Sequence, residues 1–287
     1  MNNQAQQHSG FLMSEIGITS PDECLFHVIL AGYERSVSYG KGTKNGPMAI
    51  IEASQQLELF DGESIPANMG IYTYPELIFE KSCEDALQQI ENLVFSILKQ
   101  KKIPVLLGGE HTISLGAFRA LSKLNEPIGI IQFDAHADLR DSYEDNIYSH
   151  ACVMKRAMDL DFPIAQYGVR SLSYEEHLLR KEGKIYYLDA KTLLGNIIYE
   201  NMVPEKFPKK IYITLDVDVL DASVMPSTGT PEPGGFSWYD TIRFLMNVMK
   251  ERTVVGFDVV ELAPKPGFHA PDYTVAKLVY SMMQLVR

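Results

Sequence analysis

The chain has few of the features that mark extracellular or membrane proteins. Its 287 residues include only three cysteines, Cys24, Cys83 and Cys152, which lie far apart and form no CxxC pair. This excludes a disulfide framework and is typical of proteins in a reducing cytosol. No apolar run approaches the ~20 residues of a membrane span. The first residues lack a cationic segment followed by an apolar block, so we expect no signal peptide.

The chain also has fewer basic than acidic residues. The 26 lysines and arginines are outnumbered by 37 aspartates and glutamates, which gives a net charge of −11. Nucleic acids and anionic membranes bind to basic patches, so we expect neither as a partner. The acidic balance is compatible with a small cationic substrate, although such charge more often serves solubility alone. With 46% hydrophobic residues the chain can bury a sizeable core, and we expect a cytoplasmic protein.

Short apolar runs alternate with helical patterns along the whole chain. The runs are apolar on both faces, which is typical of a parallel sheet covered by helices on both sides. We therefore predict a single α/β domain over residues 1–287, a three-layer α/β/α fold with a central, mostly parallel sheet. Residues 1–20 form an N-terminal extension, read as a loosely held terminus or an oligomer contact. Strands are expected at 26–31, 70–72, 103–107, 128–133, 164–169, 184–188, 210–215 and 254–261, and helices at 48–60, 84–100, 113–123, 150–156, 173–181, 238–250 and 272–285.

The most unusual segment is Asp134-Ala135-His136-Ala137-Asp138, which follows the apolar run at 128–133. In an extended backbone, residues at i, i+2 and i+4 point to the same side. We therefore expect Asp134, His136 and Asp138 to converge on one point.

Three further polar clusters follow predicted strands: Gly108–His111, Asp216–Asp218 and Glu261. The carboxyl edge of an open α/β sheet is where ligands bind, so all four segments are expected to build one site. Carboxylates crowded without cations would repel one another, and two divalent ions, about 3.5–4 Å apart in known two-metal sites, would balance them. Oxygen ligands with one imidazole per ion and no thiolate favour Mn²⁺ over Zn²⁺.

Each residue alone has an ordinary explanation. A single aspartate after a strand is more often a turn former, and a single histidine there is more often structural. The metal hypothesis therefore rests on the combination. His150 opens a predicted helix and is either a proton donor, since imidazole titrates near neutral pH, or without a role. Glu261 ends an apolar strand and pairs either with a cationic substrate or with a structural cation.

At these motifs the chain resembles the ureohydrolase family, which contains the arginases and agmatinases. Gly-Gly-Glu-His at 108–111, Asp-Ala-His-Ala-Asp at 134–138 and Asp-Val-Asp at 216–218 match the three metal-binding motifs of that family in order and spacing. The resemblance runs from about Gly32 to the last helix. It implies an arginase-like fold, a homo-oligomer (a trimer or hexamer) and two Mn²⁺ ions per subunit.

The resemblance also implies a role for each ligand. Asp134 and Asp216 would bridge the two ions. His111 and Asp138 would complete the coordination of one ion, and His136 and Asp218 that of the other.

The implied reaction is attack of a metal-bridging hydroxide on a guanidinium carbon. His150 lies where the family keeps its proton-shuttling histidine, and Glu261 where it keeps the carboxylate that holds the guanidinium. The chemistry agrees, because a guanidinium stays charged at neutral pH and is a poor electrophile. It requires a strong nucleophile, a paired carboxylate to aim it, and a proton for the leaving amine.

The substrate is expected to be agmatine, cleaved to putrescine and urea. The loop Thr228–Gly235, with Thr230 as a substrate contact, resembles the agmatinase version. Leu139-Arg140 replaces the Asn and Ser arrangement with which arginases bind the amino-acid end of arginine. The next loop is acidic and suits an amine tail, through Asp141, Glu144 and Asp145.

Other functions stay open at this point. Lys265–His269 looks atypical for agmatinases, so the substrate could instead be N1-aminopropylagmatine, guanidinobutyrate or arginine. A single-metal deacetylase of similar fold and a non-catalytic binding protein are the more distant alternatives.

Overall fold

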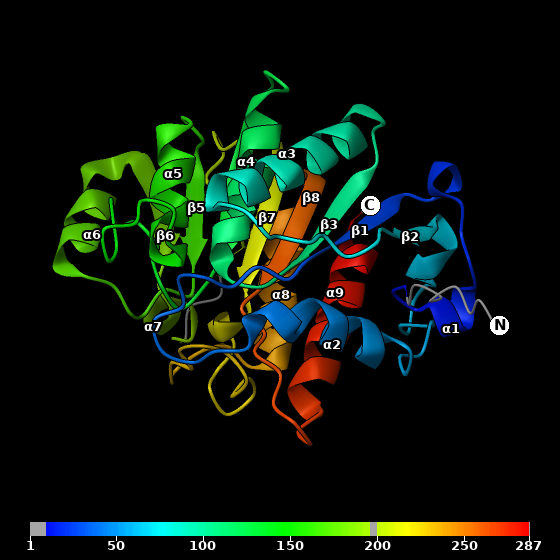
Figure 1. Cartoon of the computed structure of the whole chain (residues 1–287). Helices are drawn as coiled ribbons and strands as arrows, with labels where there is room; N and C mark the ends of the chain where they lie inside the picture. Colours follow the sequence, from blue (N-terminus) through cyan, green and yellow to red (C-terminus); the bar gives the residue numbers. More distant parts are fainter. Residues whose placement is uncertain (1–9, 196–199, 287) are drawn as a thin grey trace.

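The computed structural model describes residues 10–195 and 200–286, and its centre is one sheet of eight parallel strands (Figure 1). The strand order is β2-β1-β3-β8-β7-β4-β5-β6. This confirms the parallel sheet predicted from the apolar runs. The strands are β1 (Phe26–Ala31), β2 (Ile71–Thr73), β3 (Ile103–Gly108), β4 (Ile128–Phe133), β5 (Ile164–Tyr167), β6 (Ile185–Leu188), β7 (Lys210–Asp216) and β8 (Thr253–Val260).

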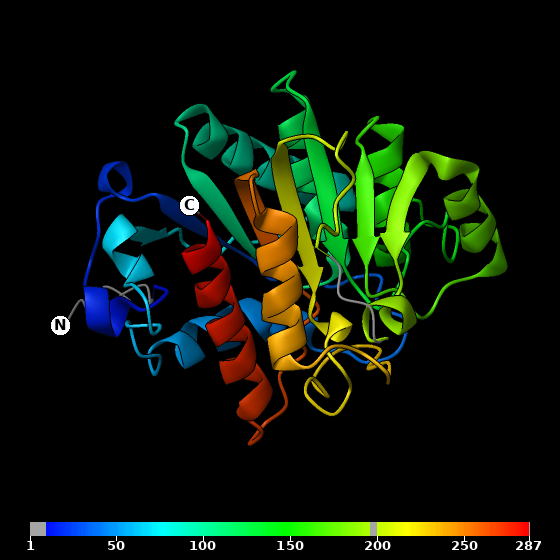
Figure 2. The ribbon, with the colours of Figure 1, turned by 180° about the vertical axis from the view of Figure 1, so that it is seen from behind.

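Helices cover both faces of the sheet, so the three-layer prediction is also confirmed. One face carries α3 (Cys83–Lys99), α4 (Ser114–Ser122) and α5 (Val153–Asp159), which are in front in Figure 1. The other face carries α2 (Gly46–Ser54), α8 (Trp238–Met249) and α9 (Ala270–Leu285), and Figure 2 shows α8 and α9 in front. The shorter helices are α1 (Met13–Ile16), α6 (Tyr174–Leu179) and α7 (Ala190–Leu193).

The inner strands are mostly apolar because they separate two hydrophobic clusters. In β1, Val28 and Leu30 pack into the cluster beneath α2, α8 and α9, whereas Ile29 packs into the one beneath α3, α4 and α5. Successive side chains of a strand point to opposite faces, so a strand buried on both faces shows no alternation.

The N-terminal segment and the end of α2 differ from the prediction for a common reason. The predicted helix 48–60 ends early, at Ser54, because side chains there bind its last turn. The amide of Gln55 donates hydrogen bonds to the carbonyls of Ile51 and Gly10, both at 2.8 Å. The hydroxyl of Ser54 accepts from the N–H of Leu12 at 3.0 Å, and Leu12 is buried. Residues 10–16 are therefore packed onto α2 rather than loosely held, while residues 1–9 lie outside the described part.

Candidate metal centre

The predicted site residues follow four strands that are neighbours in the middle of the sheet. His111 comes after β3, Glu261 after β8, Asp216 at the end of β7, and Asp134 directly after β4. Since all four strands are parallel, their carboxyl ends meet at one edge. The structure thus brings together segments that are up to 150 residues apart in the chain, as the sequence predicted.

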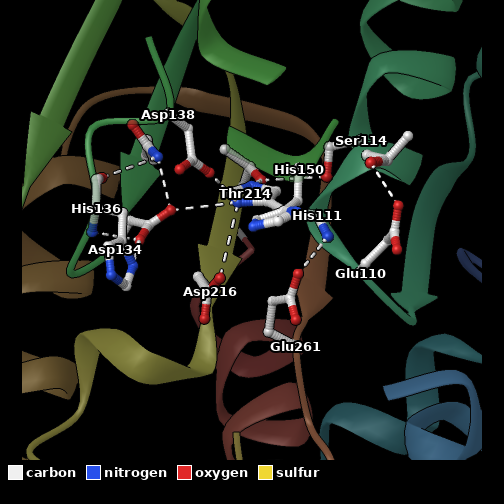
Figure 3. Close-up of polar contacts among 12 residues, drawn as sticks. Glu110, His111, Ser114, Asp134, His136, Asp138, His150, Thr214, Asp216 and Glu261 are labelled. Atoms are coloured by element: carbon white, nitrogen blue, oxygen red, sulfur yellow. Dashed lines mark hydrogen bonds and ion pairs between the residues drawn. The ribbon is translucent and has the colours of Figure 1, made fainter. Parts of the chain in front are cut away.

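Within this edge, five side chains form two overlapping groups with the geometry of metal ligands. His111, Asp134 and Asp216 make one group, and Asp134, His136 and Asp218 make the other. Potential ligand atoms within each group lie within 4.8 Å of one another. Asp134 belongs to both: its Oδ2 lies 3.2 Å from His111 Nδ1 and its Oδ1 lies 3.6 Å from His136 Nδ1 (Figure 3). One carboxylate that faces two imidazoles with different oxygens is suited to bridge two ions.

Asp138 joins the first group by a route that the sequence did not predict. Its Oδ2 lies 3.0 Å from His111 Nδ1, but β4 ends at Phe133 and Asp138 has a left-handed backbone with φ of 52°. The premise of a continuous extended segment is therefore wrong, although the predicted convergence is present. Asp218 is not in an extended segment either: β7 ends at Asp216, and Asp218 lies in the 3-10 turn Val217–Val219. That turn is capped by Asp216, whose Oδ1 accepts the N–H of Asp218 at 2.8 Å.

The Nδ1 atom of His111 is the best test of whether this site fits a cation. The hydroxyl of Thr214 donates to Asp258 Oδ1 at 2.6 Å, so it accepts the N–H of His111 Nε2 at 2.8 Å. A neutral His111 therefore presents a bare Nδ1. This atom is buried and has no hydrogen-bond partner of acceptable geometry among the described residues, yet it faces three carboxylates. A lone pair directed at carboxylates repels them unless a cation lies between, so the donor set fits a metal.

The electrostatics of the acids point to the same need. Burial raises the pKa of Asp216 well above its usual range, and repulsion from Asp218 and Asp134 adds to the effect. Burial disfavours the charged form of His111, but the carboxylates of Asp134 and Asp138 outweigh it and hold the pKa of His111 well above its usual value. Without a metal, positive charge in the site must come from protons, either on carboxyl groups such as Asp216 or on imidazoles such as His111. Bound metal cations would replace those protons.

Several supporting residues were missed from the sequence. Gln132 donates to Asp134 Oδ2 at 2.7 Å, and Gln166 in turn donates to Gln132 Oε1 at 2.6 Å. With Thr214 and Asp258, they are polar residues inside strands that are otherwise apolar, and all four are fully buried. That pattern was a usable signal, because a buried polar side chain in a strand requires a partner. Such outer partners orient metal ligands and tune their basicity.

A cavity of about 250 Å³ opens above these ligands. His150, Thr230 and Glu261, the three predicted non-metal residues, all line it. Glu261 has a left-handed backbone with φ of 68°, and its Oε1 accepts the main-chain N–H of His111 at 2.7 Å. The second oxygen, Oε2, is left for a ligand in the cavity. Burial raises the pKa of Glu261 well above its usual range, so a cation in the cavity would favour its charged form.

The three acidic side chains proposed to bind an amine tail do not line the cavity, although Tyr143 of the same loop does. Asp141 is exposed and binds Arg156 at 2.7 Å, and neither Glu144 nor Asp145 is among the lining residues. Apart from the predicted ligands and Glu261, Glu176 is the carboxylate among the described lining residues, and it was not predicted from the sequence. It serves in the capping box of α6, and Arg140 also lines the cavity.

Comparisons with known proteins agree with this site. Residues 25–284 match the family model described as the Arginase family. The chain is 35% identical over 283 residues to the N(1)-aminopropylagmatine ureohydrolase of Synechocystis sp., covering 95% of this chain and 92% of the relative. It is 31% identical over 252 residues to the agmatinase of Pyrococcus horikoshii, covering 86% and 87% of the two chains.

The fold agrees as well. The structure of the agmatine ureohydrolase of Thermoplasma volcanium superimposes with a TM-score of 0.86 at 29% identity, covering 97% of this chain and 94% of the other. No helix in the described part of the chain has both the length and the apolar character needed to cross a membrane. The family match over most of the chain, together with these relatives, shows that the chain belongs to the Arginase family and is a hydrolase of guanidino C–N bonds.

Proposed function

We propose that the protein is a binuclear manganese amidinohydrolase that cleaves an amine-tailed guanidine, agmatine or its N1-aminopropyl derivative, to urea and the free amine. The observation that carries the proposal is the shared position of Asp134 between two ligand groups at the base of a cavity. The relatives named N(1)-aminopropylagmatine ureohydrolase and agmatinase support these two guanidines as the candidate substrates.

His111 and Asp138 would hold one ion and His136 and Asp218 the other, with Asp134 shared between them. Asp216, which groups with His111 and Asp134, would be the second shared ligand, as the family resemblance implies. Two bound manganese ions would supply an activated hydroxide for attack on the guanidinium carbon.

Glu261 holds the guanidinium and aims it. Because Oε1 is fixed by the N–H of His111, Oε2 presents its charge to the cavity in one direction, and a charge-assisted hydrogen bond to the guanidinium orients its carbon toward the metal ligands. His150, which lines the same cavity, gives a proton to the alkyl-bearing nitrogen. The bond between that nitrogen and the guanidinium carbon breaks, and the products are urea and an amine.

Glu176 provides a negative charge for the tail. Its oxygens accept the N–H groups of Leu139 and Ser173, at 2.9 and 2.7 Å, which fixes the carboxylate against the cavity wall. An ammonium group at the far end of the substrate is the complementary partner. Glu176→Gln should therefore lower kcat/KM for agmatine about tenfold and affect guanidinobutyrate less, since that compound carries no ammonium. Glu175→Gln, on the exposed neighbour, is the matched control.

Arginine is the second candidate, because of Arg140. Arg140 lines the cavity, its guanidinium lies over the ring of Tyr143, 5.5 Å from the centroid, and it forms no ion pair with the described residues. A substrate carboxylate would be its natural partner. Urea release with added Mn²⁺ from agmatine, N1-aminopropylagmatine, guanidinobutyrate and arginine decides between the candidates. Activity on arginine alone would reject the amine-tailed proposal, and no urea from any of the four would reject the reaction.

A further inference from the structure

His150 is connected to a buried carboxylate through a serine hydroxyl. Ser36 Oγ lies 3.2 Å from His150 Nδ1, and it also accepts the main-chain N–H of His150 at 3.1 Å. The same hydroxyl donates to Glu110 Oε1 at 2.7 Å. Glu110 is fully buried and stands just before His111 at the end of β3, so the chain of contacts runs from the sheet edge to the cavity.

The orientation of Glu110 is fixed independently. Its Oε2 accepts the main-chain N–H groups of Arg35 and Ser36, at 2.6 and 2.7 Å. Both of these donors lie on one oxygen, so the other oxygen, Oε1, is the one that faces the hydroxyl of Ser36. Figure 3 shows Glu110 and His150 on neighbouring segments beside His111.

Counting hydrogens then determines the state of His150. A serine hydroxyl has one hydrogen, and a carboxylate only accepts, so the hydrogen of Ser36 is committed to Glu110. Both contacts of Ser36 Oγ with His150 must use oxygen lone pairs. The 3.2 Å contact is a hydrogen bond only if Nδ1 carries a proton that the hydroxyl of Ser36 accepts, and the hydroxyl of Ser149, 3.3 Å from the same Nδ1, can then accept from it as well. The Nε2 atom of the neutral ring is left bare.

We propose that Glu110 and Ser36 are positioning residues that hold His150 as the Nδ1–H tautomer, so that Nε2 is the atom that exchanges its proton with the substrate. A neutral histidine in water prefers the opposite tautomer, with the proton on Nε2. The relay therefore selects the less common form, in which one ring nitrogen is anchored and the other is free to take up and release a proton. The proton-exchange role rests on the proposed function, whereas the tautomer does not.

The tautomer is measurable by ¹⁵N NMR of the full chain labelled at histidine, free of metal and at a pH where the ring is neutral. His150→Asn identifies the signals by their loss. In the wild type we expect a protonated, pyrrole-type Nδ1 and a bare, pyridine-type Nε2. Ser36→Ala should shift the proton to Nε2.

Glu110→Gln provides a second, sharper variant. The N–H groups of Arg35 and Ser36 must be met by the amide oxygen, so the amide nitrogen faces Ser36 Oγ and donates to it. The hydrogen of Ser36 is then free to point at Nδ1, and the proton of His150 should again move to Nε2. Ser149→Ala is the matched control, because the hydroxyl of Ser149 lies 3.3 Å from the same Nδ1. This variant should keep the wild-type tautomer.

Turnover gives an independent reading. With Mn²⁺, Ser36→Ala and Glu110→Gln should lower kcat about tenfold, part of the effect of a misplaced proton donor, and leave KM unchanged. Ser36→Thr keeps the hydroxyl and should keep kcat. A bare Nδ1 in the wild type, or unchanged tautomers in both variants, would overturn the inference even if urea is produced. A protonated Nδ1 without urea production would instead overturn the proposed function and leave the tautomer standing.

Discussion

Thr214 holds the side chain of His111, the first of the proposed metal ligands along the chain, and Thr214→Val tests that role. Valine has nearly the same shape but no hydroxyl. The substitution removes the acceptor of the Nε2–H of His111 and the donor to Asp258 Oδ1, both inside the protein. The two groups lose their partner together, whereas the apolar packing around the side chain is kept.

The expected loss follows from the number of groups left unpaired. A buried donor or acceptor without a partner costs about 1–3 kcal/mol, and more when it is charged. Two such groups, offset by about 0.8 kcal/mol for the added buried carbon, lower the free energy of unfolding by about 1–5 kcal/mol, with a midpoint of about 3 kcal/mol. The loss of this outer partner of a proposed metal ligand should also weaken metal binding by about 10- to 100-fold.

The pH dependence of this loss is specific to the mechanism. Burial already raises the pKa of Asp258 to about 6, and removal of the Thr214 donor raises it further. The penalty is largest where the carboxylate is charged, so the destabilisation should be greater at pH 7 than at pH 5. Urea denaturation of the metal-free protein at both pH values measures it, and titration with Mn²⁺ measures the affinity.

The control is Thr214→Ser, which keeps both hydrogen bonds and should cost about 1 kcal/mol for the lost methyl group. If Thr214→Val stays within that cost, shows no difference between the two pH values and binds Mn²⁺ as the wild type does, the assignment of His111 Nδ1 as a ligand held through Thr214 is refuted.

Three further predictions concern the same edge of the sheet. Asp134→Asn should lose both metal ions and Asp218→Asn only one, as measured by metal content per chain; equal losses would argue against the shared position. In the metal-free protein, the raised pKa of Asp216 means that the folded state binds more protons than the unfolded one, so stability should fall as pH rises above about 4; Asp216→Asn should make this fall shallower. Gly109→Ala should cost at least about 3 kcal/mol in denaturation, because the new Cβ would lie 2.0 Å from the carbonyl oxygen of Tyr33; a cost below 1 kcal/mol, or about that, would contradict the close approach.

The location of the site was predictable because each buried parallel strand can be recognised from its own short stretch of sequence. A strand buried on both faces is a continuous apolar run, so the polar residues that follow it, such as His111 and Asp134, stand out in the sequence. Their meeting at one edge requires only that the strands be parallel. Strand order is not needed for that step.

What the sequence did not reveal depends on strand order and on single backbone angles. The pairing of Thr214 with His111 and Asp258 requires β7 to lie beside β8 and near β3. The sequences of the three strands do not indicate this order. The left-handed conformations of Asp138 and Glu261 are similarly hidden. Aspartate is only mildly favoured there, and a glutamate with positive φ is held by its surroundings rather than by its own preference.

The place of β8 in the sheet has a consequence for how the protein is made. The strand order puts β8 between β3 and β7, although β8 is the last strand of the chain. Until Thr253–Val260 has left the ribosome, β2-β1-β3 and β7-β4-β5-β6 are two half-sheets with no strand joining them. His111 belongs to the first half and Asp134 to the second. The proposed ligand group of His111, Asp134 and Asp216 would therefore form only once β8 is in place. A chain truncated before residue 253 should lose that group, whereas Asp134, His136 and Asp218 all follow strands of the second half.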